Sequence, residues 1–163
     1  MKCTECGSKL VSSIENYKYL ECGLPYVTLC DVTVRRCEKC GSVEVAISNI
    51  EGLHRSIALT LIQKPTRFTG EEIKFLRKSI GLSARLLADR MGIDPATLSR
   101  WENGHDEIGV PCDRLLRLLV ANEKPVEHYP AETLSEIEPA AKPFRVGMRA
   151  RQKVWEAQPV SAC

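Results

Sequence analysis

Residues 82–104 read LSARLLADRMGIDPATLSRWENG, and this stretch decides the fold of the middle of the chain. Ser83 is a residue of the N-cap type, and it precedes a short segment with apolar residues at helical spacing. Gly92 ends that segment and supplies a turn. Asp94 followed by Pro95 is a strong signal for the start of a second helix. The stretch therefore predicts two short helices that cross at a steep angle.

The apolar positions of this stretch predict how the two helices pack together. Ala88 is small at the point where the second helix must come close. Trp101 is expected to be a core residue rather than a ligand-binding one. The side chains expected to anchor the pair are Leu87, Met91, Ile93, Leu98 and Trp101.

Further helices are predicted on both sides of the pair, so that residues 67–124 form a helical domain. Thr69 can cap a helix that has Glu71 and Glu72 in its first turn and ends at Gly81. Residues 113–122 (DRLLRLLVAN) predict another helix, too apolar to face solvent on all sides.

The stretch resembles the helix-turn-helix of the Cro/repressor and xenobiotic-response-element family, particularly in SRWENG at residues 99–104. The resemblance implies sequence-specific binding of duplex DNA, with the helix that begins at Pro95 in the major groove.

The expected DNA-contacting residues follow from the faces left outward once Leu98 and Trp101 are buried. Arg100 is the one long side chain there that can make a bidentate contact with guanine. The alternative for Arg100 is a salt bridge with a neighbouring acid. Ser83 and Asp94 act first as helix caps. The outward residues of the second helix are Pro95, Ala96, Thr97, Ser99, Arg100 and Asn103, and Lys78, Ser83 and Arg85 are expected to contact phosphates.

Two positions depart from the pattern of that family. Ala84 stands where glutamine is frequent, and Leu86 stands where the residue is usually polar. An outward leucine favours an interface, so Leu86 and the leucines of residues 115–119 are candidate dimer contacts. A purely core role is the alternative for residues 115–119.

The N-terminal region carries two Cys-x-x-Cys-Gly motifs. In each motif the glycine (Gly7 or Gly41) can take the positive φ that lets backbone N–H groups point at sulfur. The four ligands expected are Cys3, Cys6, Cys37 and Cys40. Four thiolates favour one structural zinc ion, and they leave no open position for a catalytic one. An iron–sulfur centre or a redox dithiol is the alternative.

Residues 1–48 are expected to form a β-rich zinc domain. A period-two pattern over residues 26–35 predicts a strand, with a partner strand over residues 17–21 and a third short β-like run over residues 42–47. So small a unit buries little surface, so zinc is expected to supply much of its stability. Residues 49–66 then predict a connecting helix that ends near Gln63, before Pro65. The predicted fold class is α+β: a small β-rich zinc domain with four cysteine ligands, followed by an all-α helix-turn-helix domain.

Residues 125–163 are rich in proline and then in basic residues, and they predict a flexible tail with one short helix near residues 132–137. The alternatives for its basic part, residues 142–153, are a DNA-binding arm or a partner-docking motif.

Composition limits the other functions. The net charge of +2 gives no argument of its own for nucleic-acid binding. No apolar run is long enough for a membrane span, and a cytoplasmic, reducing location is expected. Cys22, Cys30, Cys112 and Cys163 are therefore expected to be thiols, with Cys22 and Cys30 as possible extra metal ligands. The histidines are scattered, and no constellation of residues indicates an enzyme.

The combination of both motifs resembles the YgiT/MqsA-type family of antitoxins and regulators. The resemblance covers about residues 1–122. It implies a zinc domain that binds a toxin protein and a second domain that forms a homodimer on a palindromic operator. The asparagine with which that family reads bases is replaced here by Ala96.

The sequence thus predicts a DNA-binding transcriptional repressor that also serves as the antitoxin of a toxin–antitoxin pair. A stand-alone regulator of prophage type, without a toxin, is one alternative. A protein-interaction adaptor that uses the helix-turn-helix fold without DNA is another.

Overall fold

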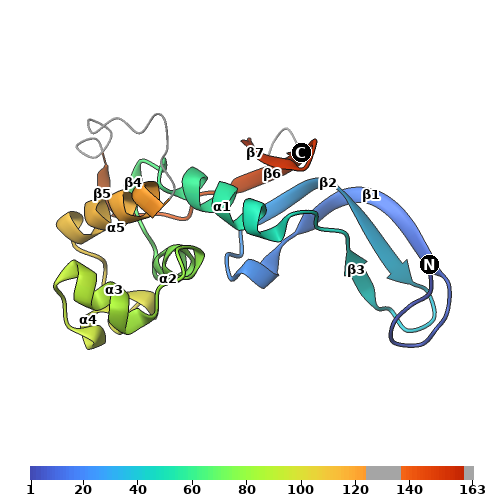
Figure 1. Cartoon of the computed structure of the whole chain (residues 1–163), viewed down its shortest axis with the longest axis horizontal. Coiled ribbons are helices and arrows are strands. Elements are labelled where there is room, and N and C mark those ends of the chain that lie inside the picture. The colour runs from blue at the N-terminus through green and yellow to red at the C-terminus, as the bar shows by residue number, and fades with distance from the viewer. Residues whose placement is uncertain (124–136, 160–163) are drawn as a thin grey trace.

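The computed structural model describes residues 1–123 and 137–159. Helices gather at one end of the molecule, a sheet lies in the middle, and a narrow β-ribbon extends to the N-terminus at the other end (Figure 1). The α+β class predicted from the sequence is confirmed. In chain order the elements are β1 (Leu10–Lys18), the 3-10 helix η1 (Leu20–Cys22), β2 (Val27–Cys37), β3 (Val43–Val45), α1 (Ile50–Leu61), β4 (Thr66–Arg67), α2 (Gly70–Ser79), α3 (Ala84–Met91), α4 (Pro95–Glu102), α5 (Val110–Glu123), β5 (Glu138–Ala141), β6 (Val146–Arg151) and β7 (Val154–Gln158).

The five-stranded sheet is built around β2, its longest strand. Strands β1 and β3 pair with β2 in antiparallel fashion, and the register aligns Leu10 with Cys37 and Val34 with Val45. The strand predicted over residues 26–35 is confirmed. The partner strand predicted over residues 17–21 is mostly wrong: β1 runs from Leu10 to Lys18, and residues 20–22 form the 3-10 helix η1, which ends at Gly23 with φ of 83°.

The C-terminal strands complete the sheet. Strand β6 pairs in parallel with β2, with Val146 opposite Val27, and β7 pairs with β6 in antiparallel fashion. The prediction of a flexible tail is therefore wrong for residues 138–158. Val146, Met148 and Trp155 are buried, so this segment supplies part of the core. The short helix predicted near residues 132–137 lies almost entirely outside the described residues.

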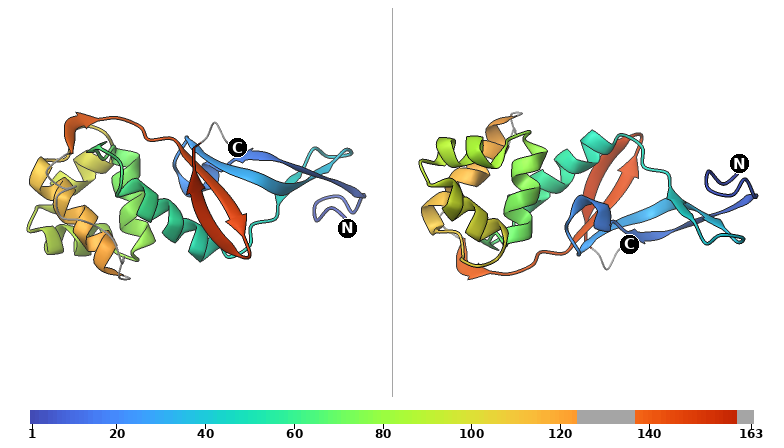
Figure 2. Two further views of the ribbon diagram at one scale, coloured as in Figure 1. Left: turned by 90° about the horizontal axis from the view of Figure 1, so that it is seen from above. Right: turned by 90° about the horizontal axis from the view of Figure 1, so that it is seen from below.

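Helix α1 covers one face of the C-terminal strands (Figure 2). Asn49 caps its start by accepting a hydrogen bond from the Gly52 N–H, and its buried stripe includes Leu53, Ile57 and Leu61. Trp155 on β7 connects β7 to the start of this helix, because its indole N–H donates to the carbonyl of Ser48, just before the N-cap, at 2.8 Å. The connecting helix predicted from the sequence is therefore part of the core rather than a free linker.

One hydrophobic core runs from the sheet through α1 into the helical end. It contains Val27 and Leu29 of β2 together with Leu98 and Trp101 of α4. A second, much smaller cluster lies apart at the tip of the ribbon, and its buried members are Cys3, Leu10 and Cys37.

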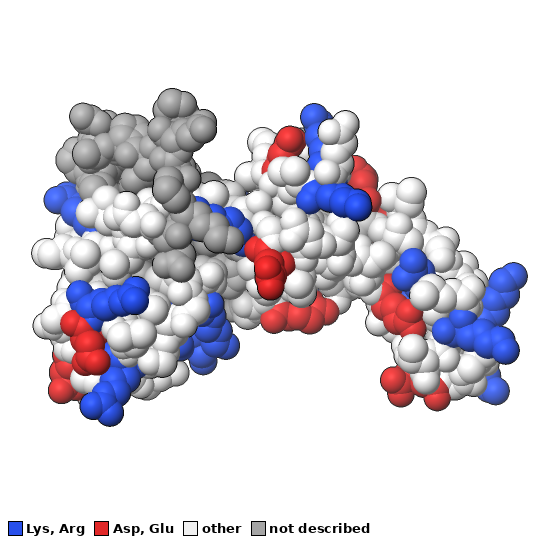
Figure 3. Space-filling model, viewed as in Figure 1, with Lys and Arg blue, Asp and Glu red and all other residues white. Residues whose placement is uncertain are grey.

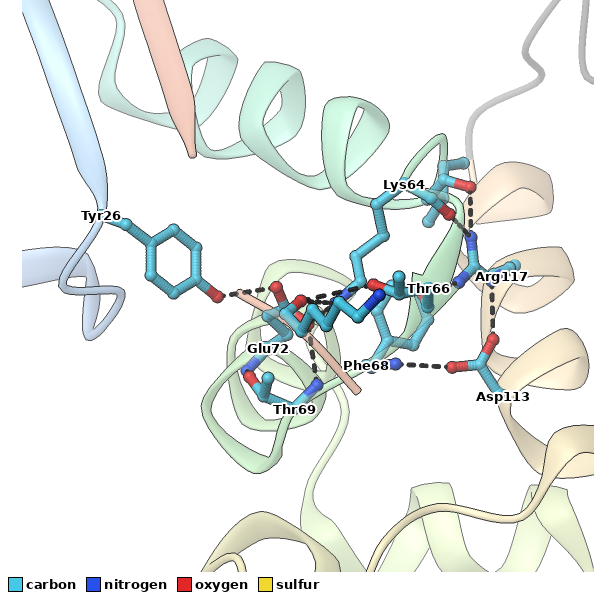
Figure 4. Close-up of polar contacts among 10 residues, drawn as sticks. Tyr26, Lys64, Thr66, Phe68, Thr69, Glu72, Asp113 and Arg117 are labelled. Carbon is cyan, nitrogen blue, oxygen red and sulfur yellow. Dashed lines mark hydrogen bonds and ion pairs between the residues drawn. The ribbon is translucent and has the colours of Figure 1, made fainter. Parts of the chain in front are cut away.

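Two buried ion pairs join the segment between α1 and α2 to its surroundings (Figure 4). In the first, the fully buried Lys64 ammonium donates to Glu72 at 2.6 Å and to the Lys142 carbonyl at 2.7 Å. Glu72 also accepts a hydrogen bond from the Tyr26 hydroxyl at 2.7 Å. The pair therefore ties the start of α2 to the loop before β2 and to the chain before β6. Burial lowers the pKa of Lys64, and the Glu72 carboxylate opposes that shift.

The second pair is Arg117 with Asp113 on α5, at 2.7 Å. The Arg117 guanidinium also donates to the carbonyls of Ile62, Lys64 and Thr66, each at 2.8 Å. Because all three guanidinium nitrogens donate to oxygen atoms, a charge that would be costly to bury alone is compensated. Neither pair was predicted from the sequence. Asp113 and Arg117 stand at the i, i+4 spacing that allows an ion pair on a helix, whereas Lys64 and Glu72 are joined only by the fold.

Candidate nucleic-acid interface and metal centre

The caps predicted for α2, α3 and α4 are all present. Thr69 forms a capping box with Glu72, in which each side chain binds the backbone N–H of the other residue. The Ser83 hydroxyl accepts from the Leu86 N–H, and the Asp94 carboxylate accepts from the Ala96 N–H. Gly92 takes a left-handed φ of 66° between α3 and α4. These local signals fix the angle between the two helices.

Helix α4 is anchored to the core by Leu98, which is fully buried, and by Trp101, which is 8% exposed. Glu102 at its end forms a two-point ion pair with Arg77 of α2, with N–O distances of 2.6 and 3.0 Å. The Arg77 guanidinium also donates to the Leu82 carbonyl at 3.1 Å. Apolar packing and this ion pair together hold α4 against the rest of the domain.

The residues predicted to contact DNA lie on the opposite side of α4 and beside it. On α4 the exposed residues are Pro95, Ala96, Ser99 and Arg100, Thr97 is half-buried, and Asn103 is exposed at the C-cap. Ser83 and Arg85 are exposed at α3, and Lys78 is exposed at the end of α2. Basic and acidic side chains are interspersed at this end of the molecule (Figure 3). The structure thus leaves an open ridge on α4 that the described part of the domain does not cover.

Arg100 is both outward and paired. Its side chain is 63% exposed, and its Nε lies 2.7 Å from a carboxylate oxygen of Asp106. Its Nη2 lies 3.4 Å from the other oxygen. The salt bridge considered from the sequence is therefore present, and the side chain still faces solvent. Asp106 was not predicted as a partner of Arg100, because only the reversal of the loop after α4 brings the two side chains together.

The leucines considered as dimer contacts differ in exposure. Leu86 on α3 is 43% exposed, as its position in the sequence predicted. On α5, Leu116 is fully buried, whereas Leu118 is 38% exposed. Helix α5 therefore has a leucine in the core and another at the surface.

The four predicted metal ligands meet at the tip of the ribbon, and all four sulfur atoms lie within 4.8 Å of one another. The two knuckles are built alike. The Gly7 N–H donates to the Cys3 carbonyl, and the Gly41 N–H donates to the Cys37 carbonyl. Both glycines have positive φ, 71° and 74°. The positive φ expected of both glycines is confirmed, and their own N–H groups donate to carbonyl oxygens rather than to sulfur.

The cluster fits a tetrahedral metal ion. A Zn–S distance of about 2.3 Å places tetrahedral sulfur atoms about 3.8 Å apart. The Sγ–Sγ distance is 3.6 Å between Cys3 and Cys40 and 3.4 Å between Cys6 and Cys37. Hydrogen bonds from Ser8 lower the pKa of Cys6 to about 6, whereas, against a backbone hydrogen bond from Ser42, the neighbouring sulfur atoms raise the pKa of Cys40 to about 12. The thiolate is therefore favoured at Cys6 and disfavoured at Cys40 while the cluster holds no cation.

Fewer residues depend on the metal cluster for their packing than the sequence predicted. The expectation that residues 1–48 depend on zinc for their core is too broad, because Val27, Leu29, Val32 and Val34 belong to the main core. Only the tip around Cys3, Leu10 and Cys37 packs separately.

The other cysteines lie outside this cluster. Cys22 and Cys112 are free and half-buried, and burial raises the pKa of both thiols. Cys30 on β2 is disulfide-bonded, so the prediction of a thiol at this position is wrong. Cys163 lies outside the described residues.

Among the histidines, His54 on α1 contacts the Tyr19 hydroxyl at 2.9 Å. Burial lowers the pKa of His54.

Comparison with known protein families finds a match to a helix-turn-helix family over residues 73–111. That span runs from within α2 to the start of α5. Comparisons with curated proteins and with solved structures found no match. Within residues 1–123 and 137–159, no helix combines the length and the apolar character needed to cross a membrane. A helix-turn-helix domain implies sequence-specific DNA binding. The chain combines this XRE-type helix-turn-helix with an N-terminal cluster of four cysteines that could hold a metal ion.

Proposed function

We propose that this protein is a transcriptional repressor that binds a duplex operator through α3 and α4. The observation that carries the proposal is the exposed ridge of α4, held on a buried base of Leu98 and Trp101 within the matched helix-turn-helix. On this proposal α4 enters the major groove and Arg100 reads a guanine. The residues assigned to DNA are Lys78, Ser83, Arg85, Pro95, Ala96, Thr97, Ser99, Arg100 and Asn103.

The test is a binding measurement with the full-length protein and duplexes from its own promoter region, titrated with salt. Selective binding to one sequence supports the repressor, and Arg100→Ala should abolish most of that selectivity. Arg151→Ala is the matched control, because Arg151 is 68% exposed and also paired with an acid, Glu156, but lies on the sheet. If the unmodified protein binds all duplexes equally, the repressor proposal is contradicted and the role of a protein-interaction adaptor is favoured.

We propose that the operator is palindromic and that the protein binds it as a homodimer. One short helix contacts few bases, and paired half-sites about 34–36 Å apart multiply those contacts. The exposed Leu86 and Leu118 support an interface on the helical end. Sedimentation analysis of the protein and of Leu86→Glu tests this. A monomer that protects a single half-site would contradict it.

The metal in the four-cysteine cluster is proposed to be one structural zinc ion. Four sulfur ligands at tetrahedral spacing support a soft, closed site over one that binds water. Elemental analysis of the purified protein, with Cys6→Ser/Cys40→Ser as control, would identify the metal and its stoichiometry. Iron or sulfide in place of zinc would overturn this assignment.

We further propose an antitoxin role, in which exposed apolar residues of the β-ribbon bind a toxin protein. Val11 and Val43 lie on one face of the ribbon, because both pair with Arg36 of β2, and they are 50% and 45% exposed; Ile14 is 74% exposed on the opposite face. Co-expression with the product of the neighbouring reading frame tests it. Rescue of cell growth by this protein, lost in Ile14→Glu, supports a toxin partner. A neighbouring product that neither harms growth nor binds would favour the stand-alone regulator.

A further inference from the structure

The ion pair between Arg100 and Asp106 points to a second residue in base recognition. This inference deepens the proposed function and rests on it. We propose that Asp106 is a positioning residue that holds the Arg100 guanidinium in the orientation that reads guanine. Asp106 would thereby set the sequence specificity of the protein without touching DNA.

The geometry of the pair leaves the useful edge of the guanidinium free. A guanidinium offers five N–H donors in a planar fork. Asp106 takes the side that carries Nε and one Nη2 hydrogen, at 2.7 and 3.4 Å. The remaining edge, with Nη1 and the second Nη2 hydrogen, has the two parallel donors that match O6 and N7 of guanine. The carboxylate therefore orients Arg100 without consuming the donors needed for guanine.

The loop that carries Asp106 is fixed to Arg100 through the backbone. The N–H groups of His105 and Asp106 both donate to the Arg100 carbonyl, at 2.9 and 3.4 Å. Gly104, with φ of 73°, makes the reversal that brings the loop back over the last turn of α4. The position of the carboxylate relative to the Arg100 side chain is thus set by the fold.

A second anchor holds the far end of the same loop. Arg67 of β4 forms an ion pair with Glu107 and donates to the Ile108 carbonyl at 2.8 Å. Arg67 is only 16% exposed, whereas Asp106 is 45% exposed and faces outward with Arg100. The loop is therefore anchored on both sides of Asp106, and Asp106 itself stays at the surface.

If Asp106 does not position Arg100, its removal should have a different effect on DNA binding. An acid that merely lies near DNA repels phosphates, so its removal would strengthen binding to every sequence. An acid that only masks Arg100 would do the same and would also improve selectivity. If Asp106 positions Arg100, its removal frees the long side chain, and discrimination at one guanine falls whatever happens to the overall affinity.

The experiment measures discrimination by the full-length protein and by Asp106→Ala. Each is titrated against the selected operator and against duplexes in which single guanines are replaced by 7-deazaguanine, which lacks the N7 acceptor. One guanine should show a large loss with the unmodified protein. At that position the ratio of affinities, which a bidentate contact sets at about five-fold or more, should fall towards one in Asp106→Ala.

Two further variants keep the outcome interpretable. Asp89→Ala removes another exposed acid of the same domain, and it should raise affinity for all duplexes equally. In an Arg100→Ala background, Asp106→Ala should change discrimination no further. An unchanged ratio in Asp106→Ala would overturn the proposal, with melting temperatures confirming that the variants fold. If the unmodified protein selects no sequence at all, the repressor function fails, and this inference fails with it.

Discussion

The guanidinium of Arg77 on α2 binds both carboxylate oxygens of Glu102, the last residue of α4. The two side chains are 12% and 9% exposed, so the pair is nearly excluded from water. It links the first helix of the domain directly to the helix proposed to read DNA. The angle of α4 therefore depends on one ion pair as well as on apolar packing.

Removing one partner of this pair should be costly. Glu102→Ala leaves the Arg77 charge nearly buried and without its carboxylate, so we expect the free energy of unfolding in urea to fall by about 3 kcal/mol. The double variant Arg77→Leu/Glu102→Leu should lose less, because no charge is stranded. Glu15→Ala is the exposed control: it breaks the surface pair with Arg36 and should cost less than about 1 kcal/mol. An equal fall in the free energy of unfolding in Glu102→Ala and Glu15→Ala would contradict the role of burial.

Gly70 should not tolerate a side chain. A Cβ at this position would overlap the Trp101 carbonyl oxygen and come within 2.9 Å of the Glu102 carbonyl oxygen, so α2 and α4 would have to separate. We expect Gly70→Ala to lower the free energy of unfolding by about 1–3 kcal/mol and to weaken operator binding. Gly109→Ala is the control, since its nearest neighbour would lie 3.9 Å away. A Gly70→Ala variant as stable as Gly109→Ala would show that the helices shift freely.

Metal removal should unfold the tip and spare the rest of the molecule. The cluster of Cys3, Leu10 and Cys37 is separate from the main core, so a chelator should release backbone protection there alone. In hydrogen exchange followed by mass spectrometry, we expect residues 1–10 and 37–43 to lose protection while α2–α5 keep theirs. Loss of the helical signal in circular dichroism on chelation would show instead that the metal supports the whole fold.

Trp155 on β7 should matter as much as a residue of the helical domain. It is 4% exposed, and its indole ties β7 to the start of α1. Trp155→Ala should cost about 3–5 kcal/mol in the free energy of unfolding. Its neighbour Val154 is 60% exposed, and Val154→Ala should change stability by less than about 0.5 kcal/mol. If Trp155→Ala unfolds at the same urea concentration as the unmodified protein, the C-terminal strands do not contribute to stability, as expected of a flexible tail.

His54 should make stability depend on pH just below neutrality. Burial lowers its pKa from 6.5, so the unfolded chain takes up a proton at this residue before the folded chain does. The contribution of His54 to stability is therefore complete above pH 6.5 and is lost as the pH falls from 6.5 towards the folded-state pKa. His54→Gln does not titrate, and its unfolding midpoint in urea should change less across this range. An identical pH dependence in both proteins would exclude His54 as the cause.

The helix-turn-helix was predictable because its signals are local. Ser83, Asp94 and Gly92 act on backbone groups close to them in the chain, and Leu98 with Trp101 repeats at the spacing of one helical face. The cysteine cluster was predictable for a related reason. Each Cys-x-x-Cys-Gly turn is complete in itself, so two such turns predict a four-sulfur site wherever the fold brings them together.

The rest depends on contacts between distant segments, which no local pattern encodes. Val146 and Val27 pair because a strand near the C-terminus fits beside β2, yet the sequence around Val146 reads as basic and proline-rich. Lys64 appears as an ordinary charged residue before a proline, and only the fold gives it Glu72 and a carbonyl as partners. Asp106 faces Arg100 because Gly104 reverses the chain.

The parallel pairing of β2 with β6 sets the order in which the protein can be completed during its synthesis. Trp155 and its partner Ser48 are 107 positions apart, so the ribosome must finish the helical domain before the sheet can close. Until then the nascent chain exposes the unpaired edge of β2, a surface on which chaperones and proteases act. During that interval the chain is therefore more exposed to proteolysis and misassembly than the completed protein is.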